Sequence, residues 1–191
     1  MMKDKKYIIF DLDGTLVDSF PTVVNACKRV FGEYALSAMP ADEVFENYRG
    51  SDMEQMFMNL SKRLNISTNE FRKKYDAQYA LDCWSGTTII HQQYEILKDA
   101  KAKGIGIIVL TNKRQELAET VCRTVFGENA IDAVIGRKDT VPIKPRHVIK
   151  DRFRQLGICS ESQCQMYYGD SQSDYETAKL LNVKYINTKI N

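Results

Sequence analysis

Asp11 and Asp13 stand two residues apart, directly after the apolar segment 7–10 and before a turn formed by Gly14 and Thr15. Side chains two residues apart on an extended segment point the same way, so both carboxylates can face one ligand. Two carboxylates at the end of a buried strand are costly unless a cation, a proton or solvent compensates their charge. The pair suits Mg²⁺ binding with nucleophilic attack by one carboxylate oxygen, and a solvated Asp-x-Asp-Gly turn is the structural alternative.

Further polar groups follow later in the chain: Thr111 and Asn112 after the apolar segment 105–110, Lys144 before Pro145, and Asp170 and Asp174 after the apolar segment 166–168. A hydroxyl at a strand end, with a helix beginning shortly after it, can donate to a phosphate oxygen while backbone N–H groups assist. Each group also has a structural interpretation, since Thr111 suits a helix N-cap, Lys144 a surface position and Asp174 a helix start. The order of these residues in the chain, and their positions after apolar segments, favour a chemical role over the structural interpretations.

Taken together, these motifs resemble those of the haloacid dehalogenase superfamily in its phosphatase form, and the resemblance runs from Asp11 to Asp174. The wording of the motifs is similar to that of phosphoglycolate phosphatases and of beta-phosphoglucomutase-like members with a helical cap. The resemblance implies that Asp11 is the nucleophile and Asp13 the general acid and base. It also implies that Lys144 neutralises the nucleophile and the phosphate, that Asp170 is a metal ligand, and that Asp174 supports the metal or its waters.

The resemblance further implies a set of ligands for each part of the substrate complex. It implies Mg²⁺ on Asp11, on Asp13 through its carbonyl, and on Asp170 with support from Asp174, and a phosphate on Thr111, Asn112 and Lys144. The resemblance also implies that Thr111 and Lys144 are catalytic residues together with Asp11 and Asp13, because they bind the phosphoryl group that is transferred. The second acid, Asp13, favours a phosphatase over a dehalogenase, since a departing halide needs no proton.

The expected activity is Mg²⁺-dependent hydrolysis of a small phosphomonoester, phosphoglycolate-like or sugar-phosphate-like, through an aspartyl-phosphate intermediate. Two alternatives stay open. A phosphomutase uses the same catalytic residues and passes the phosphoryl group back to a bound intermediate instead of to water. A non-catalytic regulatory module keeps the phosphate and metal pocket, and fold class alone does not decide among these functions.

Alternating strands and helices must position these residues. The pattern predicts strands over 6–10, 105–110, 131–135, 165–169 and 184–187, and helices over 91–103, 114–126, 146–156 and 173–181. Such alternation predicts an α/β fold with a doubly wound parallel sheet, whose ligands lie at the carboxyl ends of the strands. Asp11, Thr111 and Asp170 each follow such an end, which supports the motif assignment independently.

Residues 20–86 contain helical patterns and no convincing strand. The spacing of apolar residues predicts helices over 21–31, 52–64 and 69–84, with methionines and aromatic residues, Trp84 among them, forming the core of a helical insert. The insert resembles the family's small helical cap, so we expect a discontinuous core domain of residues 1–16 and 87–191 and a cap domain of residues 17–86. A lid of this kind excludes water from the reaction and contacts the substrate.

Arg49 is the candidate for substrate recognition within the insert. It lies in the segment 47–51 between two predicted helices, where a loop could reach the substrate. A guanidinium forks onto a carboxylate or a pair of hydroxyls, so Arg49 could bind either group. An exposed loop arginine is the structural alternative.

Composition is typical of a globular protein. The chain has 191 residues, of which 43% are hydrophobic and 27% charged, and a net charge of +2, too small to indicate nucleic-acid binding. No apolar run approaches the roughly 20 residues that span a bilayer, and the apolar residues after the basic N-terminus are too few for a signal peptide. We therefore expect a cytoplasmic monomer or weak homodimer that acts on a small phosphorylated metabolite, without a nucleic-acid or membrane partner.

The remaining reactive side chains favour structural roles. The five cysteines form no C-x-x-C pair and are expected to be reduced thiols, with Cys159 and Cys164 as the only close pair. His91 and His147 have no acid partner at a recognised spacing, which favours surface or helix-start positions over a catalytic base.

Overall fold

The chain folds into two compact units, Met1–Asp18 with Thr88–Asn191 and Ser19–Thr87. The computed structural model describes residues 5–34, 36–49, 53–138, 141–158 and 163–189. Within this part of the chain, none of the helices combines the length and apolar character needed to cross a bilayer.

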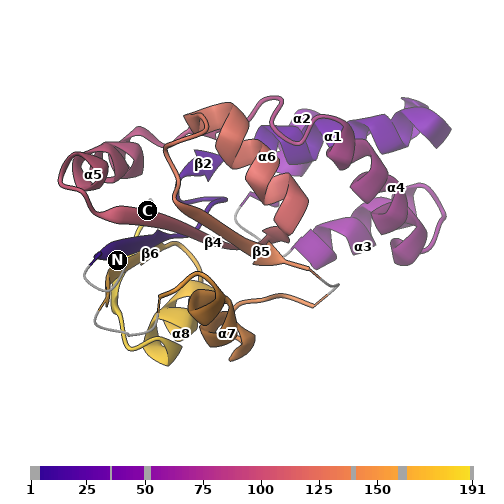
Figure 1. Cartoon of the computed structure of the whole chain (residues 1–191). Coiled ribbons are helices and arrows are strands. Elements are labelled where there is room, and N and C mark those ends of the chain that lie inside the picture. Colours follow the sequence, from indigo (N-terminus) through magenta and orange to yellow (C-terminus); the bar gives the residue numbers. More distant parts are fainter. Residues whose placement is uncertain (1–4, 35, 50–52, 139–140, 159–162, 190–191) are drawn as a thin grey trace. The chain divides into compact units, whose positions relative to one another are not determined.

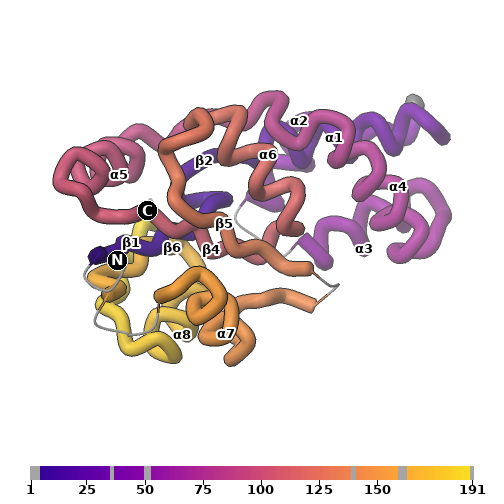
Figure 2. Tube along the Cα trace, viewed as in Figure 1, coloured from indigo at the N-terminus to yellow at the C-terminus, as the bar shows by residue number. Residues whose placement is uncertain are grey.

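The first unit is built on a parallel sheet. Its strands are β1 (Tyr7–Phe10), β4 (Gly106–Arg114), β5 (Ala133–Arg137), β6 (Cys164–Gly169) and β7 (Lys184–Asn187), in the order β5-β4-β1-β6-β7. Figure 2 shows β1 lying between β4 and β6, although those segments are far apart in sequence. All the strands predicted from the sequence are present.

Helices cover both faces of this sheet. Helices α5 (His91–Ala102) and α6 (Gln115–Phe126) lie on one face, and α7 (Val148–Gln155) and α8 (Gln172–Leu180) lie on the other (Figure 1). This arrangement confirms the predicted doubly wound α/β fold. Because both faces are covered, the central strand has no solvent side, and all of β1 is buried.

The end of β1 sets the position of the first aspartate. The Asp11 N–H donates to the Tyr168 carbonyl at 2.8 Å, so pairing with β6 continues one residue beyond the strand. Phe10 is paired with Val109 of β4 and with Tyr168 of β6. Asp11 therefore lies at the carboxyl edge of the sheet, between the ends of the two neighbouring strands, where α/β proteins bind ligands.

Strand β4 is longer than its apolar segment predicts. It continues through the polar residues Thr111 to Arg114, and Arg114 pairs with Arg137 of β5 after a register shift. The following helix has Arg114 as its N-cap. The interpretation of Thr111 as a helix N-cap is therefore wrong, because pairing with β5 holds this segment extended.

A second, antiparallel pair of strands was not predicted. Strands β2 (Val17–Asp18) and β3 (Thr88–Ile89) pair Val17 with Ile89 and Asp18 with Thr88. Two residues are too few to show an alternation pattern. The pair brings together the two points at which the chain passes from one unit to the other.

The described residues of the second unit form helices only. These are α1 (Phe20–Tyr34), the 3-10 helix η1 (Leu36–Ala38), α2 (Asp42–Glu46), α3 (Met53–Arg63) and α4 (Thr68–Leu81). Its core contains the buried rings of Phe57 and Phe71, with ring centroids 5.6 Å apart, and Phe57 lies 4.6 Å from Tyr75. The predicted aromatic core is confirmed for these residues.

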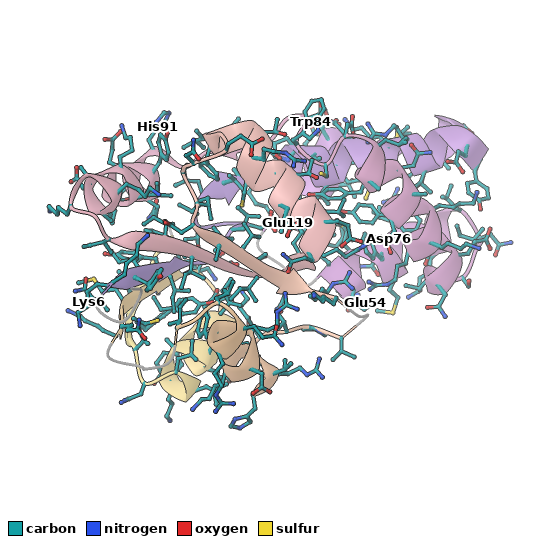
Figure 3. The ribbon with its side chains drawn as sticks, viewed as in Figure 1. Lys6, Glu54, Asp76, Trp84, His91 and Glu119 are labelled. Atoms are coloured by element: carbon teal, nitrogen blue, oxygen red, sulfur yellow. The ribbon has the colours of Figure 1, made fainter. Side chains whose placement is uncertain are left out.

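Trp84 corrects part of that prediction. It is 43% exposed and follows the end of α4 at Leu81 (Figure 3). The helix ends before the predicted residue 84, because Asp82 is its C-cap and pairs with Arg29 of α1 at 2.6 Å. At the end of α1 the predicted boundary at residue 31 is also wrong, since the helix continues to Tyr34.

Candidate active site

A buried lysine joins two of the predicted acids. Lys144 Nζ lies 2.7 Å from Asp11 Oδ1 and 2.6 Å from Asp174 Oδ1, and all three side chains are buried. Burying a charge costs free energy unless an opposite charge and hydrogen bonds compensate it. The interpretation of Lys144 as a surface residue is therefore wrong, and the lysine is the shared counter-charge of two carboxylates.

The second carboxylate, Asp174, is held on both oxygens. The Tyr167 hydroxyl donates to Oδ1 at 2.8 Å, and the Ser171 hydroxyl and N–H donate to Oδ2 at 2.5 and 3.1 Å. Ser171 is the N-cap of α8 and forms a capping box with Asp174. Asp174 is thus a helix-start carboxylate, as one interpretation of the sequence proposed, and it also contacts Lys144.

Tyr167 and Ser171 were not predicted as site residues. The Ser-x-x-Asp spacing before a helix is a signal for a capping box and could have identified Ser171. Tyr167 belongs to an apolar strand segment, and no sequence pattern shows that its hydroxyl meets Asp174.

Three carboxylates gather at this edge of the sheet. Asp11, Asp170 and Asp174 each offer an oxygen, and these oxygens lie within 4.8 Å of one another. Carboxylate oxygens are the ligands that Mg²⁺ prefers, so the donor set fits this ion. The loop after β1 approaches closely: a Cβ on Gly14, whose φ is +82°, would lie 2.3 Å from Asp170 Oδ2.

The pKa values of two carboxyls in the site are raised, as expected for acids that are buried close to one another. Burial raises the pKa of Asp11 to about 7, with Lys144 opposing the shift and Asp174 adding to it. Burial also raises the pKa of Asp170, and repulsion from Asp174 adds to that shift. Because a nearby cation lowers such raised pKa values, the electrostatics of the cluster also fit a bound divalent ion.

Lys144 keeps its charge in this environment. Burial by itself lowers the pKa of a lysine, but attraction to Asp11 and Asp174 outweighs burial and raises the pKa above its usual value. The ammonium group is therefore a permanent positive charge beside Asp11.

Asp13 faces a different lysine. Lys113 Nζ lies 2.6 Å from Asp13 Oδ1, and the lysine side chain is 7% exposed whereas the Asp13 side chain is 35% exposed. The Asp13 carboxylate is not part of the three-carboxylate cluster. Lys113 was not predicted from the sequence, although it stands only two residues after Thr111 in β4.

Thr111 and Asn112 connect the loops around the site. Thr111 is buried, and its hydroxyl oxygen accepts from the Lys113 N–H at 3.1 Å. The Asn112 side-chain oxygen accepts from the Lys144 N–H at 2.9 Å, which joins the end of β4 to the segment that bears the catalytic lysine candidate. Phosphate binding by Thr111 and Asn112 remains a prediction.

Arg49 belongs to the second unit. Its guanidinium donates to Glu46 through Nε at 2.8 Å and through Nη2 at 3.1 Å, and it lies over the Phe20 ring at 4.5 Å. Substrate binding by Arg49 remains a prediction.

The histidines lie at helix starts, as predicted. His91, labelled in Figure 3, is the first residue of α5, and His147 is the N-cap of α7; both are exposed. Cys159 lies outside the described residues, and Cys164 is a buried free thiol.

The fold and these motifs together define a class of protein. A sequence model of the haloacid dehalogenase-like hydrolases matches residues 8–188. The chain therefore belongs to the haloacid dehalogenase-like hydrolase family, which confirms the resemblance seen in its motifs.

Individual relatives are more distant. The chain is 26% identical to a phosphoglycolate phosphatase of Colwellia psychrerythraea over 95% of its own length and 83% of the relative's. It is 25% identical to a candidate pyrophosphatase of Caldanaerobacter subterraneus over 95% of its length and 80% of the relative's. A candidate beta-phosphoglucomutase of Thermotoga maritima has a similar fold, with a TM-score of 0.73 and 21% identity over 97% of this chain and 87% of that one.

Proposed function

We propose that this protein is a Mg²⁺-dependent phosphatase of small phosphorylated metabolites, phosphoglycolate-like or sugar-phosphate-like. The observation that supports the proposal most is the meeting of Asp11, Lys144, Asp170 and Asp174 at the carboxyl edge of a parallel sheet. A carboxylate nucleophile, a fixed cation beside it and a metal-binding donor set are the parts that phosphoryl transfer requires. The phosphatase names of sequence relatives support the same activity.

In the proposed reaction, one oxygen of Asp11 attacks phosphorus in line with the departing oxygen. The new Asp11–phosphorus bond forms as the bond to the leaving alkoxide breaks, and Asp13 gives its proton to that alkoxide. Asp13 then accepts a proton from water, which attacks phosphorus and releases Asp11 with inorganic phosphate. Lys144 and Thr111 hold the non-bridging oxygens of the phosphoryl group during both steps.

Asp11 and Asp170, with the Asp13 carbonyl, would hold Mg²⁺, and Asp174 would support the site. The ion supplies positive charge that screens the anionic nucleophile from the anionic substrate. The four hydrogen bonds that hold Asp174 favour a role in orienting Lys144.

Residues 19–87 are proposed to form the cap. A helical lid would exclude water from the aspartyl-phosphate and contact the part of the substrate that leaves. Arg49 is the proposed contact to a carboxylate or hydroxyl of that leaving group.

Phosphate release from a panel of compounds tests the activity. The panel contains phosphoglycolate, hexose phosphates and inorganic pyrophosphate, each assayed with Mg²⁺ and with a chelator. Release from one or a few compounds that stops with the chelator is the expected result. No release from folded, Mg²⁺-bound protein would contradict a phosphatase and direct the next assay to transfer between sugar phosphates, the mutase reaction.

The variant Asp11→Asn tests the proposed nucleophile. Loss of a charged nucleophile is expected to lower kcat by at least about a thousandfold, since the covalent route is removed. The matched control is Asp99→Asn, on the exposed side of α5, which should retain wild-type turnover. Unchanged turnover in folded Asp11→Asn protein would refute the assignment.

A further inference from the structure

Lys113 and Asp13 form an ion pair that joins the polar end of β4 to the loop after β1. The residues are 100 positions apart in sequence, and Lys113 Nζ lies 2.6 Å from Asp13 Oδ1. Each stands two residues beyond a predicted site residue, since Asp13 follows Asp11 and Lys113 follows Thr111. The pair therefore spans the ends of two adjacent strands at the proposed reaction centre.

The two partners differ in their contact with solvent. The side chain of Lys113 is 7% exposed and that of Asp13 is 35% exposed. The Lys113 backbone is held as well, because it lies in β4 and its N–H donates to the Thr111 hydroxyl at 3.1 Å. The lysine is thus the anchored partner, and the carboxylate is the partner that a leaving group or a water molecule can reach.

We propose that Lys113 is a positioning residue for Asp13: by holding Oδ1, it fixes the direction of the carboxyl group that serves the leaving group and the attacking water. This inference rests on the proposed function, because it assigns the acid and base role to Asp13. A carboxyl has two oxygens, so an anchor on one of them sets where the other points. Proton transfer requires such placement within a few tenths of an ångström, and an anchored carboxyl reaches it without losing further side-chain freedom.

Direct binding of the phosphate by Lys113 is the alternative role, and the two roles predict different kinetics for a variant that lacks the lysine. A lysine that binds the phosphoryl group directly contributes to substrate affinity, so its loss raises KM. A lysine that acts through Asp13 contributes to the proton-transfer steps, so its loss lowers kcat and leaves KM nearly unchanged. The two roles also differ when Asp13 is absent, because a positioning residue then has nothing left to position.

The test is a double-mutant cycle with an alkyl phosphate that the wild type hydrolyses. Lys113→Met is expected to lower kcat by about tenfold to a hundredfold, with KM changed by less than about threefold. The loss of kcat is smaller than the full contribution of a general acid and base, about a hundredfold to ten-thousandfold, because the Asp13 carboxyl is still present. In the Asp13→Asn background the same change should lower kcat by less than about twofold. Lys113→Arg, which keeps the charge and a donor, should restore most of the activity.

Controls separate positioning from stability. Lys98→Met removes an exposed lysine of α5 that pairs with Glu95 and should leave kcat and KM at wild-type values. Lys113→Met should remain folded, because its partner carboxylate is partly exposed and can be solvated; Lys113→Gln, which keeps a polar terminus, is a second variant with the same expected loss. Thermal unfolding of each variant monitors the fold.

Three results would overturn the proposal: a raised KM with unchanged kcat, an equal loss of kcat with and without Asp13, or unchanged kinetics. If the wild type hydrolyses no compound, the proposed function fails, and the inference is decided separately by crystal structures of the wild type and Lys113→Met. The Asp13 side chain is expected to change rotamer or lose order in the variant. An Asp13 side chain in the same orientation in both proteins would overturn the inference without any assay of activity.

Discussion

Gly14 illustrates how single residues set the geometry of the site. Its φ of +82° belongs to the left-handed region, and its Cα faces the Asp170 carboxylate so closely that a Cβ would lie 2.3 Å from Oδ2. Gly104 also has a positive φ, +73°, but has open space where a Cβ would lie. Substitution of Gly104 by alanine therefore tests backbone strain alone, whereas the same substitution at Gly14 adds a steric clash with Asp170.

We predict that Gly14→Ala weakens Mg²⁺ binding and Gly104→Ala does not. Gly104→Ala should lower the free energy of unfolding by about 1–2 kcal/mol, because alanine is strained at positive φ, and Gly14→Ala should lower it by at least as much, because the clash with Asp170 adds to the strain. Only Gly14→Ala should displace Asp170 and raise the Mg²⁺ concentration needed for half-maximal activity by about tenfold or more. A Mg²⁺ titration of activity, with thermal melts of both variants, makes the comparison. Equal Mg²⁺ dependence in the two variants would contradict the proposed metal site.

Asp132 connects α5 to the sheet near the amino ends of β4 and β5, at the opposite edge from the candidate site. Its carboxylate precedes β5 and accepts from Lys5 Nζ at 2.7 Å, from Lys101 Nζ of α5 at 3.1 Å and from the Ile107 N–H of β4 at 2.8 Å. Burial raises the pKa of Asp132, but the hydrogen bonds from Lys5, Ile107 and Lys101 outweigh burial and lower that pKa below its usual value. The carboxylate therefore stabilises the packing of α5 and two strands while it is ionised.

This shift predicts an acid-sensitive contribution to stability. Because the folded-state pKa is lower than the unfolded one, the contribution is complete above a pH of about 4 and is lost as the pH falls through the folded-state pKa. Asp132→Asn should lower the free energy of unfolding by about 1 kcal/mol at pH 7, a modest value because the carboxylate is partly exposed. The difference from wild type should shrink below pH 4.

Urea unfolding of both proteins between pH 3 and pH 7 measures this difference. The control is Asp151→Asn on α7, where the carboxylate and its partner Arg154 are both exposed. Its effect should be small at every pH, since exposed ion pairs contribute little. A constant gap between wild type and Asp132→Asn down to pH 3 would show that ionisation is not the cause.

At the scale of the whole molecule, the chain divides into two compact units, and each contains buried aromatic residues. Phe71 is buried against Phe31 and Phe57 in the unit of residues 19–87. Phe153 is buried in the cluster that packs α7 on the parallel sheet of the other unit. Because each ring packs within its own unit, its loss is expected to affect that unit first.

We predict that Phe71→Ala and Phe153→Ala destabilise different parts of the chain. Each removes a buried ring and should cost about 3–5 kcal/mol in the unit that contains it. Hydrogen exchange should accelerate within residues 19–87 for Phe71→Ala, and mainly in the sheet and its helices for Phe153→Ala. Uniform acceleration over the whole chain in Phe71→Ala would show instead that the two units unfold together.

Periodicity located the main elements because long apolar segments have few alternatives. The buried strands, the four helices that flank the sheet and the aromatic residues of α3 and α4 all follow from patterns of four residues or more. Boundaries were less accurate where pairing or capping decides them, as at the polar end of β4 and at Trp84. The two-residue strands β2 and β3 leave no pattern, since they form only because distant segments meet.

The sequence by itself determined the family, the fold class and the identity of the candidate acids, because these depend on residue types at fixed places after apolar segments. Only the tertiary structure decided which side chains contact one another. Lys144 is shared by Asp11 and Asp174. Tyr167 and Ser171 donate to Asp174, and Lys113 pairs with Asp13. These contacts join residues up to 133 positions apart, as between Lys144 and Asp11. Local patterns specify which segments become strands, whereas the order of strands in the sheet specifies which loops meet at its carboxyl edge.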